Sequence, residues 1–136
     1  MTNRHWQVSY GDVPHDINPD AYPSVTAMMN EAMQRHAARP AFRCAGQTLS
    51  YADMDRLSRD FAAYLQSKLG VKKGDRIAVM TPNLLAFPIA FLGIIRAGAA
   101  QVNVNPLYTP RELEHQLNDA GVETIIVFSG VSGTVA

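Results

Sequence analysis

The sequence predicts an α/β domain, a parallel sheet with flanking helices, and three observations support this. Short apolar runs of strand type alternate with helical patterns over the second half of the chain. Two of the helical patterns begin with residues that cap helices well. The 136 residues, of which 47% are hydrophobic and 18% charged, suffice for one globular domain. Strands that alternate with helices pair in parallel through right-handed crossovers.

The N-terminal part, residues 1–23, is predicted to be an extended arm and not a helix. It places Trp6, Tyr10 and Tyr22 among three prolines, a mixture typical of an extended segment whose aromatic rings need a cover. These three aromatic residues are the candidate self-association residues. The rest of the chain, residues 24–136, is predicted to be the α/β body. An arm folded back over this body is the alternative.

The first elements of the body are a helix and a hairpin. Apolar positions at helical spacing predict a helix from Ser24 to about Arg39, just before a proline. Three methionines on this helix are interpreted as core filling. Two short strand-like runs on either side of Gly46-Gln47 predict a hairpin.

The next helix has a clear start and a clear end. Ser50 can cap it while Asp53 bonds back to the Ser50 amide, and Leu49 can pack on Met54 across the cap. Gly70 is expected to end this helix.

The alternating series follows. Pro88 lies inside the predicted apolar helix, so we expect a kink or an irregular first turn there. No crossover helix is predicted after the final strand, so we expect its apolar side chains to lie near solvent. The series comprises a strand at 76–80, a helix at 84–97, a strand at 101–105, a helix at 110–120 and a strand at 124–128.

The loop before the helix at 110–120 is interpreted as a capped turn and not as a phosphate site. Thr109 is the natural cap, Pro110 takes the first helical position, and Glu112 closes the capping box. Tyr108 and Leu113 can pack across the cap. A helix start can bind an anion, but here the cap occupies the amides and Glu112 adds negative charge.

No other group of residues in the sequence predicts a metal, phosphate or catalytic site. Glu112 and His115 have the spacing of half a dimetal site, but without a second pair a solvated helix face is favoured. The glycines of residues 128–134 lie where a phosphate loop could follow a strand, yet the loop has no lysine, which favours a chain end. No nucleophile, base and oxyanion stabiliser occur together. The residues therefore predict no catalytic, cofactor-binding or metal-binding residue.

Composition gives limited information about partners and compartment. Twelve basic and twelve acidic side chains cancel, which gives no reason to expect nucleic acid or an anionic membrane surface. Cys44 is the single cysteine, and the start of the chain has no apolar signal segment, so a cytoplasmic location is expected. The longest apolar run, residues 84–95, is shorter than the ~20 residues of a membrane span.

Several stretches resemble the N-terminal part of bacterial AMP-forming long-chain fatty acid–CoA ligases. They are "LSYADMDRLSRDFAAYLQ", "GVKKGDRIAVMTPNLLAFPIAFLGIIRAG" and above all "VNVNPLYTPRELEHQLNDAG". "LSYADM" and "IIRAGAAQVNVNP" also resemble the first two core motifs of the wider acyl-adenylating superfamily. The resemblance covers about Asp16 to Val127 and stops near Ser129. It identifies the chain as an incomplete part of the large N-terminal domain of such an enzyme.

The resemblance implies a reaction for the full-length enzyme. With ATP and magnesium it forms an acyl adenylate from a fatty acid, and it then transfers the acyl group to coenzyme A. The motifs that carry the phosphate-loop lysine, the acidic ligands and the catalytic lysine have no counterpart here, so the chain alone is expected to be inactive. Homodimer formation and a peripheral association of the full-length enzyme with the inner membrane are further expectations from the resemblance.

Two other functions remain open from the residues. One is a stand-alone module that binds a nucleotide or coenzyme A at the strand ends near Asn83, Asn105 and Ser129. The other is an oligomerisation module that works through the aromatic arm.

Overall fold

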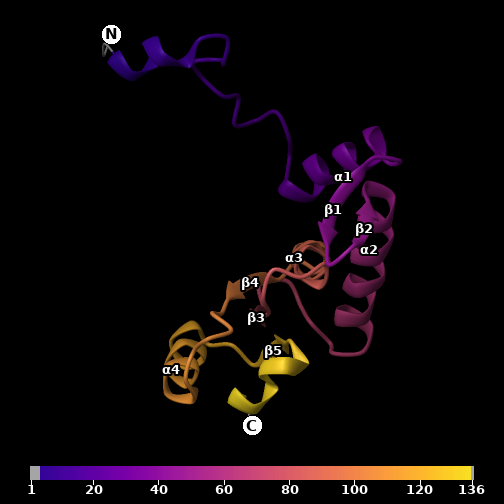
Figure 1. Cartoon of the computed structure of the whole chain (residues 1–136), viewed down its shortest axis with the longest axis vertical. Coiled ribbons are helices and arrows are strands. Elements are labelled where there is room, and N and C mark those ends of the chain that lie inside the picture. Colours follow the sequence, from indigo (N-terminus) through magenta and orange to yellow (C-terminus); the bar gives the residue numbers. More distant parts are fainter. Residues whose placement is uncertain (1–3, 136) are drawn as a thin grey trace.

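The computed structural model describes residues 4–135 as an α/β body from which an N-terminal arm projects (Figure 1). The body is built around a three-stranded sheet, with a separate two-stranded hairpin beside the first helices. The elements in chain order are η1 (His5–Tyr10), α1 (Val25–Arg35), β1 (Pro40–Cys44), β2 (Gln47–Ser50), α2 (Tyr51–Ser67), β3 (Arg76–Met80), α3 (Ala86–Arg96), β4 (Ala100–Asn103), α4 (Pro110–Ala120), β5 (Thr124–Val127) and η2 (Ser129–Thr134).

The predicted parallel sheet is confirmed. Its strands lie in the order β4-β3-β5, so the first strand of the series is the central one, and both neighbours run parallel to it. In the register, Val79 lies between Asn103 of β4 and Ile126 of β5. Two consecutive crossovers through α3 and α4 produce this order, and they leave β4 and β5 as the two edges.

Each face of the sheet is covered by its own layer of helices. Ile77 and Val79 point from β3 into a cluster with α2 and α3, whereas Ala78 and Met80 point into a second cluster that includes Leu113 of α4. All four β3 side chains are buried. Alternation along the strand therefore divides one sheet between two apolar clusters, as parallel strands require.

The two helices α2 and α3 approach one another closely. A Cβ built on Gly93 would come within 2.6 Å of the Phe61 ring, so only glycine fits this crossing without movement. Nearby, Arg96 at the end of α3 donates to the Asp55 carboxylate on α2 at 2.7 Å, and only 8% of the Arg96 side chain is exposed. The helix pair is thus fixed by a small residue and by a buried cation.

The hairpin and both caps are confirmed. The hairpin turns at Ala45 and Gly46, where φ is 49° and 79°, as a two-residue turn of this kind requires. In the capping box of α2, the Asp53 amide donates to the Ser50 hydroxyl at 3.1 Å and the Ser50 amide donates to the Asp53 carboxylate at 3.0 Å. These bonds from the Ser50 hydroxyl and amide lower the pKa of Asp53. Leu49 and Met54 share one apolar cluster, as expected.

Two predicted helix boundaries are wrong. The helix predicted to reach about Arg39 ends at Arg35, because the chain turns at His36 and the Arg39 amide donates to the His36 carbonyl before β1 begins. The helix predicted from residue 84 begins at Ala86. Pro88 therefore lies in its first turn, where the missing amide has no intrahelical partner to lose.

Both ends of the described chain differ from the sequence prediction. The arm is not extended throughout, because His5–Tyr10 forms a 3₁₀-helix. The segment interpreted as a chain end forms a second 3₁₀-helix, Ser129–Thr134, and its Val131 packs on the cluster beneath α4. Within residues 4–135, none of the helices has the length and apolar character needed to cross a membrane.

Candidate functional site

The carboxyl ends of the three parallel strands are the first place to look for a site, because open α/β sheets bind ligands there. Asn83, Asn105 and Ser129 follow β3, β4 and β5, so the sheet brings all three to the same edge, as the sequence predicts. What this edge can bind depends on which of its polar atoms have no hydrogen-bond partner.

Hydrogen bonds engage several polar groups at this edge. The Asn105 side chain accepts from the Leu107 amide at 3.0 Å and shapes the turn after β4. The Asn83 carbonyl accepts from the Cys44 thiol at 3.6 Å, and the Ser129 carbonyl accepts from the Ser132 hydroxyl at 2.8 Å. The Asn105 and Ser129 contacts are those of turns, and the Asn83 contact joins the hairpin to the loop after β3. None of these bonds directs a donor toward a common phosphate position.

The loop before α4 is a capped turn, as predicted. The Glu112 amide donates to the Thr109 hydroxyl at 3.4 Å, and the Thr109 amide donates to the Glu112 carboxylate at 2.8 Å. Tyr108 and Leu113 belong to one apolar cluster across this cap. The Thr109 backbone amide, and then its hydroxyl, lower the pKa of Glu112. A carboxylate held ionised over the helix start repels an anion.

We expect Thr109→Ala to lower the free energy of unfolding by ~0.5–2 kcal/mol, because it leaves helix amides without an acceptor. The Glu112 carboxylate contributes to the free energy of unfolding at neutral pH, because its pKa is lowered in the folded state. This contribution is lost as the pH falls through the range where the carboxylate is protonated. Urea unfolding at neutral and acidic pH measures both effects.

Thr109→Ser, which keeps the hydroxyl, is the matched control and should retain most of the stability. Nucleotide affinity, measured by calorimetry, should be the same for the wild-type chain and both variants. A loss of nucleotide binding in Thr109→Ala at unchanged stability would identify the loop as a binding site.

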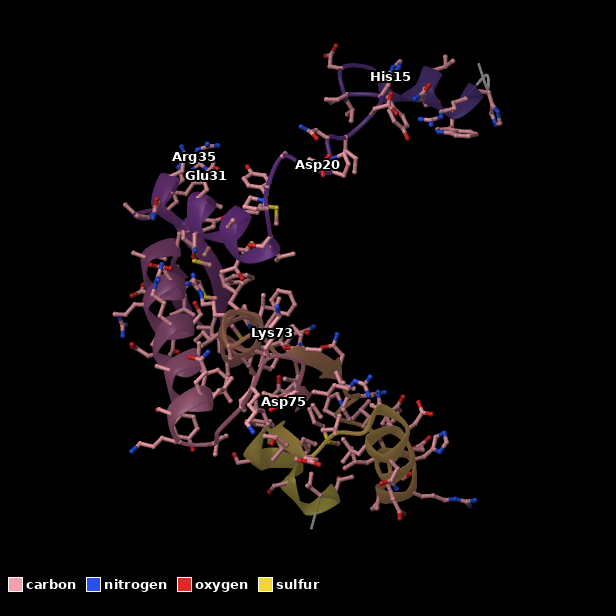
Figure 2. The ribbon with its side chains drawn as sticks, turned by 180° about the vertical axis from the view of Figure 1, so that it is seen from behind. His15, Asp20, Glu31, Arg35, Lys73 and Asp75 are labelled. Carbon is pink, nitrogen blue, oxygen red and sulfur yellow. The ribbon has the colours of Figure 1, made fainter. Side chains whose placement is uncertain are left out.

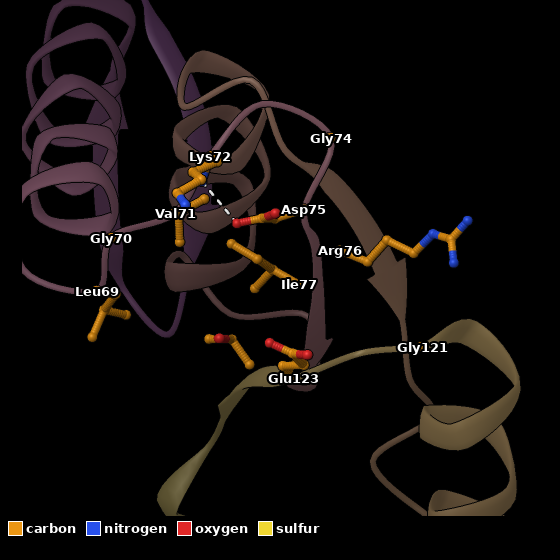
Figure 3. Close-up of a pocket in the computed structure, with 11 residues that line it drawn as sticks. Leu69, Gly70, Val71, Lys72, Gly74, Asp75, Arg76, Ile77, Gly121 and Glu123 are labelled. Atoms are coloured by element: carbon orange, nitrogen blue, oxygen red, sulfur yellow. Dashed lines mark hydrogen bonds between the residues drawn. The ribbon is translucent and has the colours of Figure 1, made fainter.

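A hollow lies at the opposite, amino-terminal edge of the sheet (Figure 3). Its volume is about 470 Å³, and Leu69, Ile77 and Thr124 are among the residues that line it. Asp75 accepts from the Lys72 amide at 2.7 Å, and Arg76 donates to the Ala120 carbonyl at the end of α4 at 2.9 Å. Side chains of both signs line this hollow, so its charge selects neither an anion nor a cation. Sequence reasoning missed it because its lining comes from two stretches, 69–77 and 121–124, that are more than 40 residues apart in the chain.

A second hollow, of about 390 Å³, is mainly apolar. It lies between the hairpin and the start of α3, where Phe42, Phe87 and Phe91 line it together with Cys44. Phe42 and Phe91 are exposed. The Cys44 thiol donates to the Asn83 carbonyl, and within residues 4–135 no side chain of a general base is hydrogen-bonded to it, so the hollow offers an apolar surface and not a nucleophile.

The third feature is the face of α4 that carries Glu112 and His115, which line a hollow of about 270 Å³. The Glu112 carboxylate is engaged by Thr109, which leaves His115 without its expected companion ligand. Within residues 4–135, no three His, Cys, Asp or Glu side chains are grouped so that they could hold a metal ion. The donor set described here does not fit magnesium.

The candidate self-association residues lie on the arm and stay uncovered. Trp6, Tyr10 and Tyr22 are 52%, 37% and 38% exposed. The arm is held together locally, by an Arg4–Asp16 ion pair at 2.7 Å and by the edge-to-face contact of Tyr10 with His15. Figure 2 shows His15 on the arm, far from Lys73 and Asp75 of the body. The alternative of an arm folded back over its own body is not what this structure has.

Comparison with known proteins supplies what the geometry does not. A family model described as AMP-binding enzyme matches residues 29–135. The match continues past Ser129, so the expectation that the resemblance ends there is wrong. A long-chain-fatty-acid–CoA ligase of Escherichia coli is 53% identical over 124 residues, which are 91% of this chain and 22% of the ligase. The chain thus spans about a fifth of the length of such relatives.

Solved structures of acyl-adenylating enzymes share the fold. A Mycobacterium tuberculosis fatty acyl CoA synthetase superposes with a TM-score of 0.75 at 26% identity, over 81% of this chain and 22% of that one. The N-terminal subdomain of NpsA from Klebsiella oxytoca gives a TM-score of 0.73 at 26% identity, over 76% of this chain and 27% of that one.

Proposed function

Because the chain belongs to the family of AMP-binding enzymes, we propose that it is the N-terminal portion of a long-chain fatty acid–CoA ligase. The observation that carries the proposal is the 53% identity to such a ligase over 91% of the chain. In the proposed reaction the carboxylate of a fatty acid attacks the α-phosphorus of ATP and displaces pyrophosphate, which gives an acyl adenylate. The thiol of coenzyme A then attacks the acyl carbon and displaces AMP.

The proposal assigns a structural role to the residues of this chain. The polar groups at the carboxyl edge of the sheet are engaged in turns, and the described residues do not fit magnesium. We therefore derive no catalytic step from them. The groups that hold ATP, magnesium and coenzyme A would belong to the other parts of the whole enzyme. Within it, this chain would contribute a sheet, two helix layers and the capped loop at Thr109.

The first test measures activity of the chain alone. Incubation with ATP, magnesium, coenzyme A and palmitate should release no pyrophosphate and form no thioester above the blank, because among the described residues no group is placed to stabilise charge on the transferred adenylyl group. The E. coli relative under the same conditions is the positive control. Turnover by the isolated chain would contradict the proposal.

A chimera tests the positive side of the same proposal. This chain replaces the matched segment of the E. coli ligase, and the chimera should form acyl-CoA from palmitate. The ligase without its matched segment is the control and should be inactive. An inactive chimera that folds with the melting temperature of the ligase would show that the chain does not serve this function.

The location of the whole enzyme is part of the proposal. We place it in the cytoplasm, with a peripheral association with the inner membrane, where an apolar substrate is concentrated. Cosedimentation of the active chimera with lipid vesicles tests this association, and release by detergent but not by salt is expected for apolar contact.

A second proposed function is self-association through the arm. Three exposed aromatic residues on a locally ordered arm favour it, since large exposed apolar side chains mark interaction sites. Trp6 is the single tryptophan, so its fluorescence reports the arm alone. Its emission should shift to the blue as the chain concentration rises. Light scattering should show a dimer that disappears on removal of residues 1–23. Emission that is independent of concentration would contradict the proposal.

A further inference from the structure

The lysines of this chain are gathered in one place. All three, Lys68, Lys72 and Lys73, lie within six residues at the end of α2 and in the loop that follows it. With Arg76, residues 64–76 hold four cations against one carboxylate, that of Asp75. The zero net charge of the whole chain therefore hides a local positive excess. Within residues 4–135, no lysine forms an ion pair, so these charges are available to a partner.

Two exposed apolar side chains stand among the lysines. Tyr64 and Leu69 are each 49% exposed. Tyr64 and Lys68 lie one helical turn apart, and the Lys68 amide donates to the Tyr64 carbonyl at 2.9 Å, so both belong to one face at the end of α2. Figure 3 shows Leu69 and Lys72 on the loop that joins α2 to β3. The lysine surface is defined as Tyr64, Lys68, Leu69, Lys72 and Lys73.

The loop that carries this surface is anchored to the body. Val71 is buried, and its amide donates to the Leu65 carbonyl at 3.0 Å. The Gly74 amide donates to the Gly98 carbonyl at 2.9 Å. A Cβ built on Gly98 would lie 3.5 Å from Lys73, so Lys73 packs beside the turn that follows α3. These contacts hold the lysines together at the amino-terminal edge of the sheet.

We propose that the lysine surface binds an anionic lipid bilayer. Lysines near a membrane surface are attracted by anionic headgroups, and tyrosine and leucine side chains enter the boundary between headgroups and acyl chains. A nucleic acid offers phosphates but no apolar layer for Leu69, so the mixture of cations and apolar side chains favours a bilayer. The arm is not involved, since Lys73 lies far from it (Figure 2).

This inference rests on the membrane association proposed above, to which it adds the contact surface and the lipid charge. The two kinds of side chain differ in their response to salt. Salt screens the attraction of the lysines and leaves the apolar contact in place. Lipid charge, compared at one salt concentration, is therefore the variable that reports the lysines.

Cosedimentation of the full chain with lipid vesicles tests the lysines. The chain should bind vesicles of phosphatidylglycerol and phosphatidylethanolamine more strongly than vesicles of phosphatidylcholine. The triple variant Lys68→Gln, Lys72→Gln and Lys73→Gln should bind the anionic vesicles about a hundredfold more weakly, because each lysine near such a surface contributes about fivefold.

A second triple variant is matched in charge. Arg39→Gln, Arg43→Gln and Arg111→Gln removes three other exposed cations that form no ion pair within residues 4–135. It lowers the net charge by the same amount, and its binding should fall by less than about fivefold, the contribution of one lysine at the surface. Equal losses in the two triple variants would show that net charge alone acts, which would overturn the inference.

Leu69→Ser tests the apolar part of the same surface. It should weaken binding to both kinds of vesicle by about tenfold, because half of this side chain is available for burial. Leu107→Ser, at a position that is 86% exposed on the loop before α4, is the control and should bind as the wild-type chain does. Equal binding of Leu69→Ser and Leu107→Ser would contradict the proposed contact.

The remaining outcomes separate this inference from its alternatives. Stronger binding to a DNA duplex than to anionic vesicles would identify a different partner and overturn it. A blue shift of Trp6 emission that vesicles still cause in the lysine variant would assign membrane binding to the arm. A chain that binds neither kind of vesicle also refutes the inference, whereas the ligase proposal is decided separately, by acyl-CoA formation in the chimera.

Discussion

Asp55→Ala is expected to lower the free energy of unfolding by about 3 kcal/mol, because it leaves a buried cation without its partner. Arg96 is 92% buried as a side chain, since 8% of it is exposed, and its guanidinium bonds to the Asp55 carboxylate at 2.7 Å and to the Met33 sulfur at 3.4 Å. The sulfur is a weak acceptor and cannot replace a carboxylate. Urea unfolding of the variant gives the loss directly.

Two further variants separate the ion pair from helix effects. Asp60→Ala removes an exposed carboxylate from the same helix, where its ion pair with Arg56 at 3.7 Å is worth only about 0–1 kcal/mol. Adding Arg96→Met to Asp55→Ala should recover most of the loss, since an apolar side chain of similar length needs no partner. If Asp55→Ala costs no more than Asp60→Ala, the buried pair does not stabilise the helix layer.

Leu65→Ala should lower the free energy of unfolding by about 2–5 kcal/mol, through lost burial and the cavity that remains. Leu65 has no exposed surface, and it packs from α2 against the cluster that includes Ile77 of β3 and Ile94 of α3. The variant is expected to keep its far-ultraviolet circular dichroism spectrum at room temperature and to melt at a lower temperature.

Leu107→Ala is the matched control, because the same side-chain atoms are removed from a position that is 86% exposed. Its effect should stay within about 0.5 kcal/mol. A similar loss from both variants would mean that the α2 layer is not packed as described.

The sequence predicts those parts of the fold that depend on interactions between residues close together in the chain. The start and end of α4 follow from a cap, a proline and a glycine within one segment, and the structure confirms both boundaries. The Ser50–Asp53 box confirms the start of α2 in the same way. Three residues or fewer separate the groups that fix each of these starts, so their pattern is readable in the sequence.

The parts that sequence misses depend on contacts between distant segments. Nothing local to Arg96 indicates that it is buried, because Asp55 lies 41 residues earlier. The hollow that Leu69 and Thr124 line likewise forms only when the loop after α2, β3 and β5 are in place. The site prediction was limited for the same reason. The residues at the carboxyl edge are brought together as expected, but their hydrogen bonds, which include one from the Cys44 thiol to the Asn83 carbonyl 39 residues away, could not be read from residue types.

The strand order β4-β3-β5 also has a consequence for biosynthesis. The central strand, β3, is made first and receives its second neighbour only when β5 has left the ribosome. Roughly 50 residues must be added in between, which takes a few seconds at about 5–20 residues per second. During this interval one edge of β3 is bare while α2 and α3 are already available to cover one face. We therefore expect ribosome-associated chaperones to bind most to nascent chains in which α4 has left the ribosome and β5 has not.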